Sequence, residues 1–347
     1  MEKIRIGLIG LGFMGSTHFR IHRENPAAEI VALADVEECK RKGDISSVIG
    51  NIGNADNSQP LDLTGVKVYD NAFDLIADPN VDMVDICVPT EYHARIVIAA
   101  LENGKHVFSE KPLCRNRAES DEIIAAVKKA KTFFNAGLCV RAWPEYDYTA
   151  RNIKAGTYGK VISATFRRLS PSIAGNNWQD WFMDGNRSGG ALLDMHMHDT
   201  DFIRYLLGRP EKVVSFGRTI CSHNGGIDHV ITVYDYGQGG PLVEGEGSWG
   251  APKTTPFEMT FQIICEKATV RLMAEGFKVY WNDGKIETPE VEATTGWHKE
   301  LYYFVDCVKN GTTPDRYQTI DDIRDGFLIA LAEQESIEKN APVTIQY

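Results

Sequence analysis

The sequence predicts an α/β domain with a doubly wound parallel sheet over residues 1–130, followed by an α+β domain with a large, open, mostly antiparallel sheet over residues 131–347. Three observations support this. A chain of 347 residues is too long for one ordinary hydrophobic core. Up to about residue 130, short apolar strands alternate with helical segments, which is typical of parallel strands joined by right-handed crossovers. Beyond that point, strand-like segments separated by turn signals follow one another with few helices between them.

The first element of the chain sets the interpretation of the rest. Ile4–Ile9 is short and apolar and indicates a buried strand, and Ser16–Glu24 indicates a helix. Between them stands Gly10-x-Gly12-x-x-Gly15, which is typical of a Rossmann dinucleotide-binding turn. In that turn the first glycine permits the sharp bend, the second lets the backbone approach a pyrophosphate, and the third lets helix and strand pack closely. An ordinary glycine turn is the alternative.

The next strand, Glu29–Ala34, ends in Asp35, 20 residues after Gly15. An acid at this place accepts hydrogen bonds from the adenosine ribose, although a solvated strand-end carboxylate is the alternative. Glu37 and Glu38 follow, and their charges would repel a 2′-phosphate, so the sequence favours NAD over NADP. The basic run at residues 40–42 could still reach such a phosphate.

The remaining elements follow in order, with one irregular excursion. Gly43–Gly65 is rich in Gly, Asn, Asp and Ser and indicates a surface loop. The later segments of the first domain alternate again: strand Val81–Val88, helix Tyr92–Asn103, strand Lys105–Ser109, a helix capped by Asn116-x-x-Glu119, and strand Thr132–Ala136. The second domain is expected to contain strands Val161–Leu169, Lys212–Ile220, His229–Tyr236, Leu242–Trp249, Phe257–Cys265 and Ala268–Met273, and terminal helices Trp297–Lys309 and Asp321–Lys339.

Composition excludes several classes of protein. The net charge of −11 argues against a nucleic-acid or anionic-membrane partner. No apolar run approaches the 18 or so residues of a membrane span, and the first residues lack the pattern of a signal peptide. Seven scattered cysteines without a CxxC pair indicate reduced thiols, so we expect a cytoplasmic protein. A wide sheet in the second domain would leave one face to cover, which makes self-association through it plausible.

Two stretches carry candidate chemistry. Lys111, in Ser109-Glu110-Lys111-Pro112, follows a predicted parallel strand directly and should project from the edge where such sheets bind ligands. A surface lysine beside a loop proline is the alternative.

The second stretch follows Gly189-Gly190 and predicts a helix to about Leu207. Asp194 and His198 stand four residues apart and share a helix face, a workable general base with an orienting partner. A purely structural pair is equally compatible with the spacing. His196 falls on the far side of the helix, so one ion cannot easily join it to the other two, and we expect no metal.

Candidate substrate contacts lie at the predicted domain junction and in a polar loop. Arg141 and Trp143 lie at the predicted domain junction, where they could shape a pocket or simply pack a hinge with a salt bridge. Trp178 and Trp181 stand in a polar loop, where an aromatic ring could stack on a sugar or only pack the loop. We select Arg141, Arg168 and Trp181 as candidates for substrate recognition.

Together these motifs resemble the Gfo/Idh/MocA family, which includes glucose–fructose oxidoreductase and inositol dehydrogenase. The similarity covers essentially the whole chain. It is carried by Gly10-x-Gly12-x-x-Gly15, Pro89-x-x-x-His93, Glu110-Lys111-Pro112, Gly189-Gly190 and Asp194-x-x-x-His198. Thr90 stands where many members have Asn, and the Gly43–Gly65 excursion is longer than usual.

The resemblance implies a two-domain NAD(P)-dependent dehydrogenase acting on a secondary alcohol of a sugar, sugar derivative or cyclic polyol, assembled as a homo-dimer or homo-tetramer through the C-terminal sheet. It implies that Lys111, Asp194 and His198 are catalytic. The cofactor, NAD rather than NADP, would be bound by Gly10, Gly12, Phe13, Met14, Gly15, Asp35, Pro89, Thr90, His93, Glu110 and Lys111. Two other functions stay open: redox-neutral glycoside cleavage with a retained NAD, and a non-catalytic NAD-binding sensor.

Overall fold

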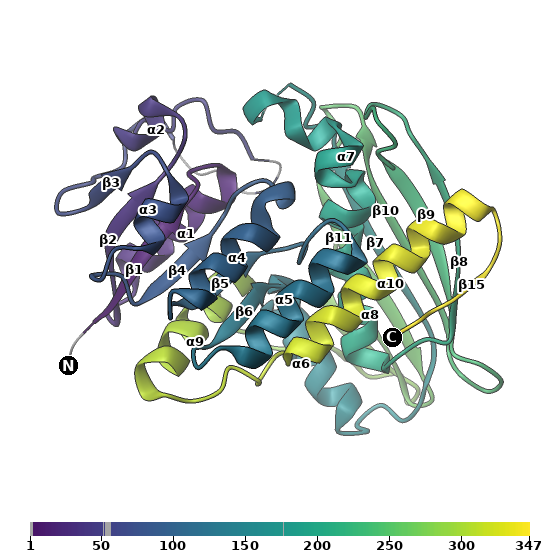
Figure 1. Ribbon diagram of the computed structural model, residues 1–347. Helices are drawn as coiled ribbons and strands as arrows, with labels where there is room; N and C mark the ends of the chain where they lie inside the picture. The colour runs from purple at the N-terminus through teal and green to yellow at the C-terminus, as the bar shows by residue number, and fades with distance from the viewer. Residues whose placement is uncertain (1–2, 51, 53–56, 176) are drawn as a thin grey trace. The chain divides into compact units, whose positions relative to one another are not determined.

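The computed structural model describes residues 3–50, 52, 57–175 and 177–347 (Figure 1). Contacts divide the chain into two compact units. The first comprises Met1–Leu138, Gly175–Trp181 and Trp297–Arg324, and the second comprises Cys139–Ala174, Phe182–Gly296 and Asp325–Tyr347. The first unit therefore extends past residue 130 and recruits a C-terminal segment. Local sequence patterns carry no signal for such a return of the chain.

The first unit is a doubly wound α/β domain, as expected. Its six strands are parallel and run in the order β3-β2-β1-β4-β5-β6, which reverses between β1 and β4. Ligands of such sheets bind outside the carboxyl ends of the strands at that reversal. The strands are β1 Ile4–Ile9, β2 Ala28–Ala34, β3 Lys67–Tyr69, β4 Met83–Ile86, β5 His106–Glu110 and β6 Phe134–Gly137.

Helices cover this sheet and bury its apolar residues. The helices are α1 Phe13–Glu24, α2 Glu38–Arg41, α3 Ala72–Ile76, α4 His93–Glu102, α5 Arg117–Lys129 and most of α9 Gly296–Asn310, with a short 3₁₀ turn at Thr90–Tyr92. The predicted cap of α5 is confirmed, because the Asn116 side chain accepts a hydrogen bond from the Glu119 N–H at 3.0 Å. Leu301 and Phe304 of α9 pack with Ile6 and Phe108 of the sheet, which explains why this C-terminal helix belongs to the first unit.

The second unit contains the expected large open sheet. Nine strands run in the order β14-β13-β12-β11-β7-β10-β9-β8-β15, and neighbours are antiparallel except for the central parallel pair β7–β10. The strands are β7 Val161–Pro171, β8 Lys212–Arg218, β9 His229–Asp235, β10 Leu242–Ala251, β11 Glu258–Cys265, β12 Ala268–Met273, β13 Gly276–Trp281, β14 Ile286–Glu287 and β15 Val343–Thr344.

One face of this sheet is covered by helices, which are α6 Pro144–Lys154, α7 Gly185–Ser188, α8 Met197–Leu207 and most of α10 Ile320–Lys339. Tyr146 of α6 and Phe202 of α8 pack edge-on against each other and against Phe166 and Phe261 of the sheet. Figure 1 shows α10 running across the strands, and the Ser336 hydroxyl at its C-terminal end accepts a hydrogen bond from a β8 backbone N–H. These helices therefore fix the buried face of the sheet.

The predicted helix after Gly189-Gly190 is not regular. It begins with a π-helical turn, Leu192–His196, and only then continues as α8. The strands β3, β13, β14 and β15 were not predicted, because short strands gain much of their structure from pairing with their neighbours. Helix α6 was not predicted either. No helix in the described part of the chain has both the length and the apolar character needed to cross a membrane.

Candidate active site

The three glycines of the first turn are required for three different reasons. Gly10 has a φ of +91°, and a Cβ there would lie 2.5 Å from the Cys87 carbonyl oxygen. A Cβ on Gly15 would overlap the Gly10 carbonyl oxygen, so α1 can sit this close to β1 only with glycine. A Cβ on Gly12 would meet no protein atom within 4 Å. The protein itself therefore does not need a glycine at residue 12, and the open space beside it fits the approach of a dinucleotide pyrophosphate.

The acid at the end of β2 is held beside this turn. Asp35 accepts hydrogen bonds from the Leu11 N–H at 2.7 Å and from the Glu37 N–H at 2.8 Å. Arg41 donates to the Asp35 and Val36 carbonyl oxygens at 2.8 and 2.9 Å. The two lysines that flank Arg41 form ion pairs with the glutamates at residues 37 and 38. The arrangement supports a ribose-binding carboxylate and leaves the basic run engaged with acids and carbonyl groups.

Residues of the predicted surface loop Gly43–Gly65 pack against the N-terminal part of α1. The Phe13 ring lies in contact with the Gly50 backbone and edge-on to Trp297, with 6.4 Å between ring centroids. Further along α1, Arg20 donates to the Asn57 side chain at 2.8 Å. The excursion Gly43–Gly65 therefore packs along α1 where it is described, and residues 51 and 53–56 lie outside the described part. Phe13 and Met14 are partly exposed at the start of α1.

The loop that carries Lys111 follows β5 at the expected edge. The Glu110 carboxylate is buried and accepts a hydrogen bond from the Lys111 N–H at 3.1 Å, while the Lys111 side chain is partly exposed. The Lys111–Pro112 peptide bond is cis. Lys111 thus stands one residue beyond a buried strand, at the sheet edge where ligands bind.

His93, predicted beside the cofactor, is fully buried at the start of α4, next to Pro89 and the buried Thr90. Its Nδ1 lies 2.8 Å from the Pro112 carbonyl oxygen and its Nε2 lies 2.9 Å from the Val88 carbonyl oxygen. Burial lowers the pKa of His93 even though both carbonyl groups favour its charged form. The ring therefore bridges the end of β4 and the Lys111 loop, which favours a role in positioning that loop.

In the second unit, Asp194 and His198 are the partly exposed members of an otherwise buried helical segment. Asp194 lies in the π-helical turn and His198 lies four residues later in α8. Turns of this kind inside helices are frequent at functional sites. A partly exposed histidine with a partly exposed carboxylate four residues before it is compatible with general base chemistry.

His196, between these two residues, points into the core. Its Nε2 lies 3.2 Å from the Tyr234 hydroxyl and 3.5 Å from the Glu333 carboxylate, and Thr200 donates to the same carboxylate at 2.9 Å. A Cβ on Gly247 of β10 would lie 2.6 Å from the His196 side chain, so this glycine leaves room for the ring. These contacts hold the π-helical turn on its core side, and they were not predicted from the sequence.

Two of the residues predicted to contact substrate form buried ion pairs with side chains of the protein. Arg141 is fully buried and forms a bidentate ion pair with Asp201, at 2.7 and 2.5 Å. Arg168 is buried in the same way on Asp199, at 2.8 and 3.0 Å. Both carboxylates belong to α8, so the arginines anchor that helix, and the predicted substrate contact has no support in this geometry. Trp181 is partly buried in the 3₁₀ segment Trp178–Met183, and its role stays a prediction.

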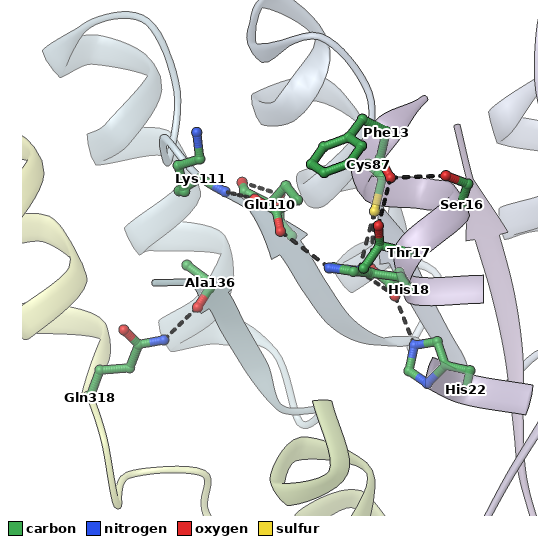
Figure 2. A network of polar contacts seen from close by, with 12 residues as sticks. Phe13, Ser16, Thr17, His18, His22, Cys87, Glu110, Lys111, Ala136 and Gln318 are labelled. Carbon is green, nitrogen blue, oxygen red and sulfur yellow. Dashed lines mark hydrogen bonds and ion pairs between the residues drawn. The ribbon is translucent and has the colours of Figure 1, made fainter. Parts of the chain in front are cut away.

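A buried polar cluster between α1 and β4 was not predicted from the sequence (Figure 2). His18 and His22 of α1 both contact the carboxylate of Asp85 on β4, at 3.0 and 2.8 Å. Burial opposes charge on His18, but Asp85 and Cys87 raise its pKa well above the usual value. Burial would raise the pKa of Asp85, yet the two histidines hold it well below its usual range. An aspartate inside the apolar segment Val81–Val88 was the available signal.

The ligand atoms of His18, Asp85 and Cys87 lie within 4.8 Å of one another, which is close enough to consider a metal. Hydrogen bonds already join these three side chains. Burial also raises the pKa of the Cys87 thiol. The hydrogen bonds among these side chains make the group part of the polar core of the domain.

A testable prediction concerns Glu300 of α9, whose pKa is raised well above the usual value by burial and by the nearby Glu110. Because the folded-state pKa is raised, the protonated form favours folding. Stability is therefore lost as the pH rises from the unfolded-state pKa towards the folded-state pKa. Glu300→Gln removes this loss, so its melting temperature relative to the wild type should increase as the pH rises from about 4.3 towards the folded-state pKa, by about 3 °C per pH unit. A difference that is constant across this range in thermal melts would contradict the buried, raised-pKa assignment.

A second prediction separates the glycines. Gly12→Ala should weaken NAD binding by about 10- to 100-fold, because a methyl group would fill the space for the pyrophosphate, and should leave stability nearly unchanged. Gly15→Ala is the matched control and should lower the free energy of unfolding by about 1–3 kcal/mol or more, because its Cβ overlaps backbone. Isothermal titration with NAD and chemical denaturation measure both effects. Equal losses of stability in the two variants would show that Gly12 is structural.

The glycine turn with open space at Gly12, Asp35 beside it and Lys111 at the same sheet edge define the class of protein: a dinucleotide-dependent oxidoreductase domain joined to a second α+β domain. The comparison with known families agrees. Residues 4–138 match the model of the "Oxidoreductase family, NAD-binding Rossmann fold", and residues 146–271 match the "GFO/IDH/MocA C-terminal domain". The chain belongs to the Gfo/Idh/MocA oxidoreductase family, as the resemblance implied.

Relatives and solved structures point the same way. The chain is 32% identical to the myo-inositol 2-dehydrogenase of Thermotoga maritima over 68% of its own length and 66% of that protein. It is 26% identical to the scyllo-inositol 2-dehydrogenase (NAD(+)) of Bacillus subtilis over 99% of its length and 97% of that protein. A levoglucosan dehydrogenase in complex with NADH and levoglucosan shares the fold, with a TM-score of 0.84 over all of both chains at 22% identity.

Proposed function

We propose that the protein is an NAD-dependent dehydrogenase that oxidises a secondary alcohol of a cyclic polyol or sugar, of the inositol or anhydrosugar type. This proposal rests on two features of the first unit. The glycine turn has open space beside Gly12, where a pyrophosphate would fit, and Lys111 stands at the same edge of the sheet. The partly exposed Asp194 and His198 supply the base that alcohol oxidation needs. The names of the full-length inositol dehydrogenase relatives support the substrate class.

The mechanism assigns one task to each side chain. NAD, when bound at Gly12 and Asp35, supplies the hydride acceptor. The imidazole of His198 takes the hydroxyl proton, since histidine is the side chain most often used as a general base. The ammonium group of Lys111 donates a hydrogen bond to the substrate oxygen and stabilises the negative charge that develops there. Asp194 orients the imidazole or binds a neighbouring hydroxyl.

The test is an absorbance assay for reduced nicotinamide with cyclic polyols, aldoses and anhydrosugars, each with NAD and with NADP. We expect a signal with NAD and one substrate class. Lys111→Ala should lower kcat by about 10²- to 10⁴-fold and change the Kd for NAD less than about threefold. Lys129→Ala, an exposed lysine on α5, is the control and should leave both unchanged. Equal losses in kcat and NAD affinity in Lys111→Ala would make this lysine a cofactor ligand. Absence of turnover across the panel with confirmed NAD binding would contradict the dehydrogenase.

We further propose self-association through the uncovered face of the large sheet. Phe216 pairs with Ile231 and Val214 pairs with Val233 on the exposed face of β8 and β9, and Phe216, Ile231 and Val233 are exposed large apolar residues. A contiguous apolar patch of this kind marks an interaction surface. Sedimentation should show a dimer or tetramer that Phe216→Glu dissociates. Ile286→Glu, on the edge strand β14, is the control and should leave the assembly intact, and a monomeric wild type would contradict the proposal.

The proposed compartment is the cytoplasm, and the state of the cysteines supports it. All seven cysteines are free thiols in the structure, and four of them are buried. Proteins that pass through oxidising compartments use cysteines chiefly as disulfides. The net charge of −11 likewise favours a small-molecule substrate over a nucleic acid.

A further inference from the structure

We propose that His18 is a positioning residue that holds the Lys111 loop in place from the cofactor-binding helix, through the carboxylate of Glu110. The inference rests on the proposed function, because it takes Lys111 as the group that acts on the substrate oxygen. It adds a residue to which neither the motif nor the mechanism assigns a task. The connection runs from β4 to α1, from α1 to the end of β5, and from there to the backbone of Lys111 (Figure 2).

The first link fixes the imidazole on β4. His18 Nδ1 lies 3.0 Å from one Asp85 carboxylate oxygen and 3.2 Å from the other, and 3.3 Å from the Cys87 sulfur. The His18 and Asp85 side chains are both fully buried. Asp85 also contacts His22 Nε2, one helical turn later, at 2.8 Å. The ring therefore has one orientation, set by a carboxylate that contacts two residues of the same helix.

The second link joins the ring to Glu110. His18 Nε2 and Glu110 Oε1 lie 3.2 Å apart, at ion-pair distance. Both atoms are buried, and neither has a well-aligned hydrogen bond to any described group, so charge and not a hydrogen bond joins them. A proton on each ring nitrogen makes the imidazole of His18 a cation, which is the form that attracts both the Asp85 and the Glu110 carboxylates. The raised pKa of His18 is consistent with this doubly protonated ring.

The third link reaches the catalytic loop. The second oxygen of Glu110, Oε2, accepts the backbone N–H of Lys111 at 3.1 Å. A Cβ on Gly137 of β6 would lie 2.9 Å from Glu110 Oε1, so the neighbouring strand leaves room for this carboxylate and little more. On the far side of Lys111, the Pro112 carbonyl oxygen is held by His93. The loop is therefore fixed on both sides of the lysine by a buried histidine.

The chemistry of the cluster argues for a function beyond stability. Burying paired charges is no more stabilising than filling the same volume with apolar side chains, so a buried His18–Glu110 pair is weak evidence for a stabilising role. What the pair adds is direction, since it fixes the carboxylate whose other oxygen binds Lys111. A displacement of about 1 Å of a reacting group costs about 100-fold in rate.

The experiment compares His18→Gln with His22→Gln. Both replace a buried histidine of α1 that contacts Asp85, but His18 alone of the two is paired with Glu110 in the structure. With the substrate found in the absorbance panel, His18→Gln should lower kcat by about 10- to 100-fold, with KM and the Kd for NAD changed less than about threefold. His22→Gln should lower the melting temperature to a similar extent and change kcat less than threefold. Equal effects of the two variants on kcat would overturn the proposal.

A readout without substrate keeps the inference separate from the proposed function. Competitive labelling of lysines with acetic anhydride, quantified by mass spectrometry, measures the reactivity of Lys111 relative to the exposed Lys129. His18→Gln and Glu110→Gln should each change this ratio at least threefold, and His22→Gln should not. An unchanged ratio in His18→Gln would refute the positioning role even if Lys111→Ala abolishes turnover. A changed ratio in a protein that oxidises no alcohol of the panel would support the link and contradict the dehydrogenase.

Discussion

The close seating of α1 against the turn after β1 is the constraint on which the first unit depends. Gly15 permits it, because any side chain there would overlap the Gly10 carbonyl oxygen. This contact directs the free N–H groups of the helix towards the open space beside Gly12, where a phosphate is favoured by those groups and by the helix dipole. It also brings the second turn of the helix down onto β4, so that His18 meets Asp85 inside the domain. Cofactor site and polar core are thus consequences of one packing contact.

Buried charge is the recurring device in both units. In the first, two histidines share Asp85. In the second, Arg141 and Arg168 are each buried on a carboxylate of α8. Such pairs contribute little to net stability, because desolvation of both partners offsets their attraction, yet removing one partner leaves an uncompensated charge. They are therefore suited to fixing the orientation of an element. The elements they fix are the helices and loops that carry Lys111, Asp194 and His198.

The fold could be predicted from sequence wherever one local pattern decides it. The apolar runs of β1 and β12 and the Asn116 cap were predicted at the residues observed, because burial and capping are read from neighbours in the chain. The π-helical turn at Leu192–His196 was not predicted, because its sequence spacing is that of a regular α-helix. The contacts of His196 with Tyr234 and Glu333, which are distant in sequence, accompany the turn. The ion-pair partners of the arginines and the His18 cluster were not predicted for the same reason: these partners lie 31 to 67 residues away, and sequence alone does not pair them.

The most direct test of dehydrogenase activity follows the hydrogen atom on the carbon that is oxidised. The protein is incubated with NAD and an inositol or anhydrosugar that carries deuterium at the carbon to be oxidised, and the nicotinamide and the sugar are examined by mass spectrometry. The account predicts deuterium in free reduced cofactor, in one-to-one amount with ketone product. Deuterium that returns to the sugar without free reduced cofactor would contradict net dehydrogenation and indicate redox-neutral chemistry. Deuterium that never leaves the sugar, in a protein that binds NAD, would contradict catalysis on this class of substrate.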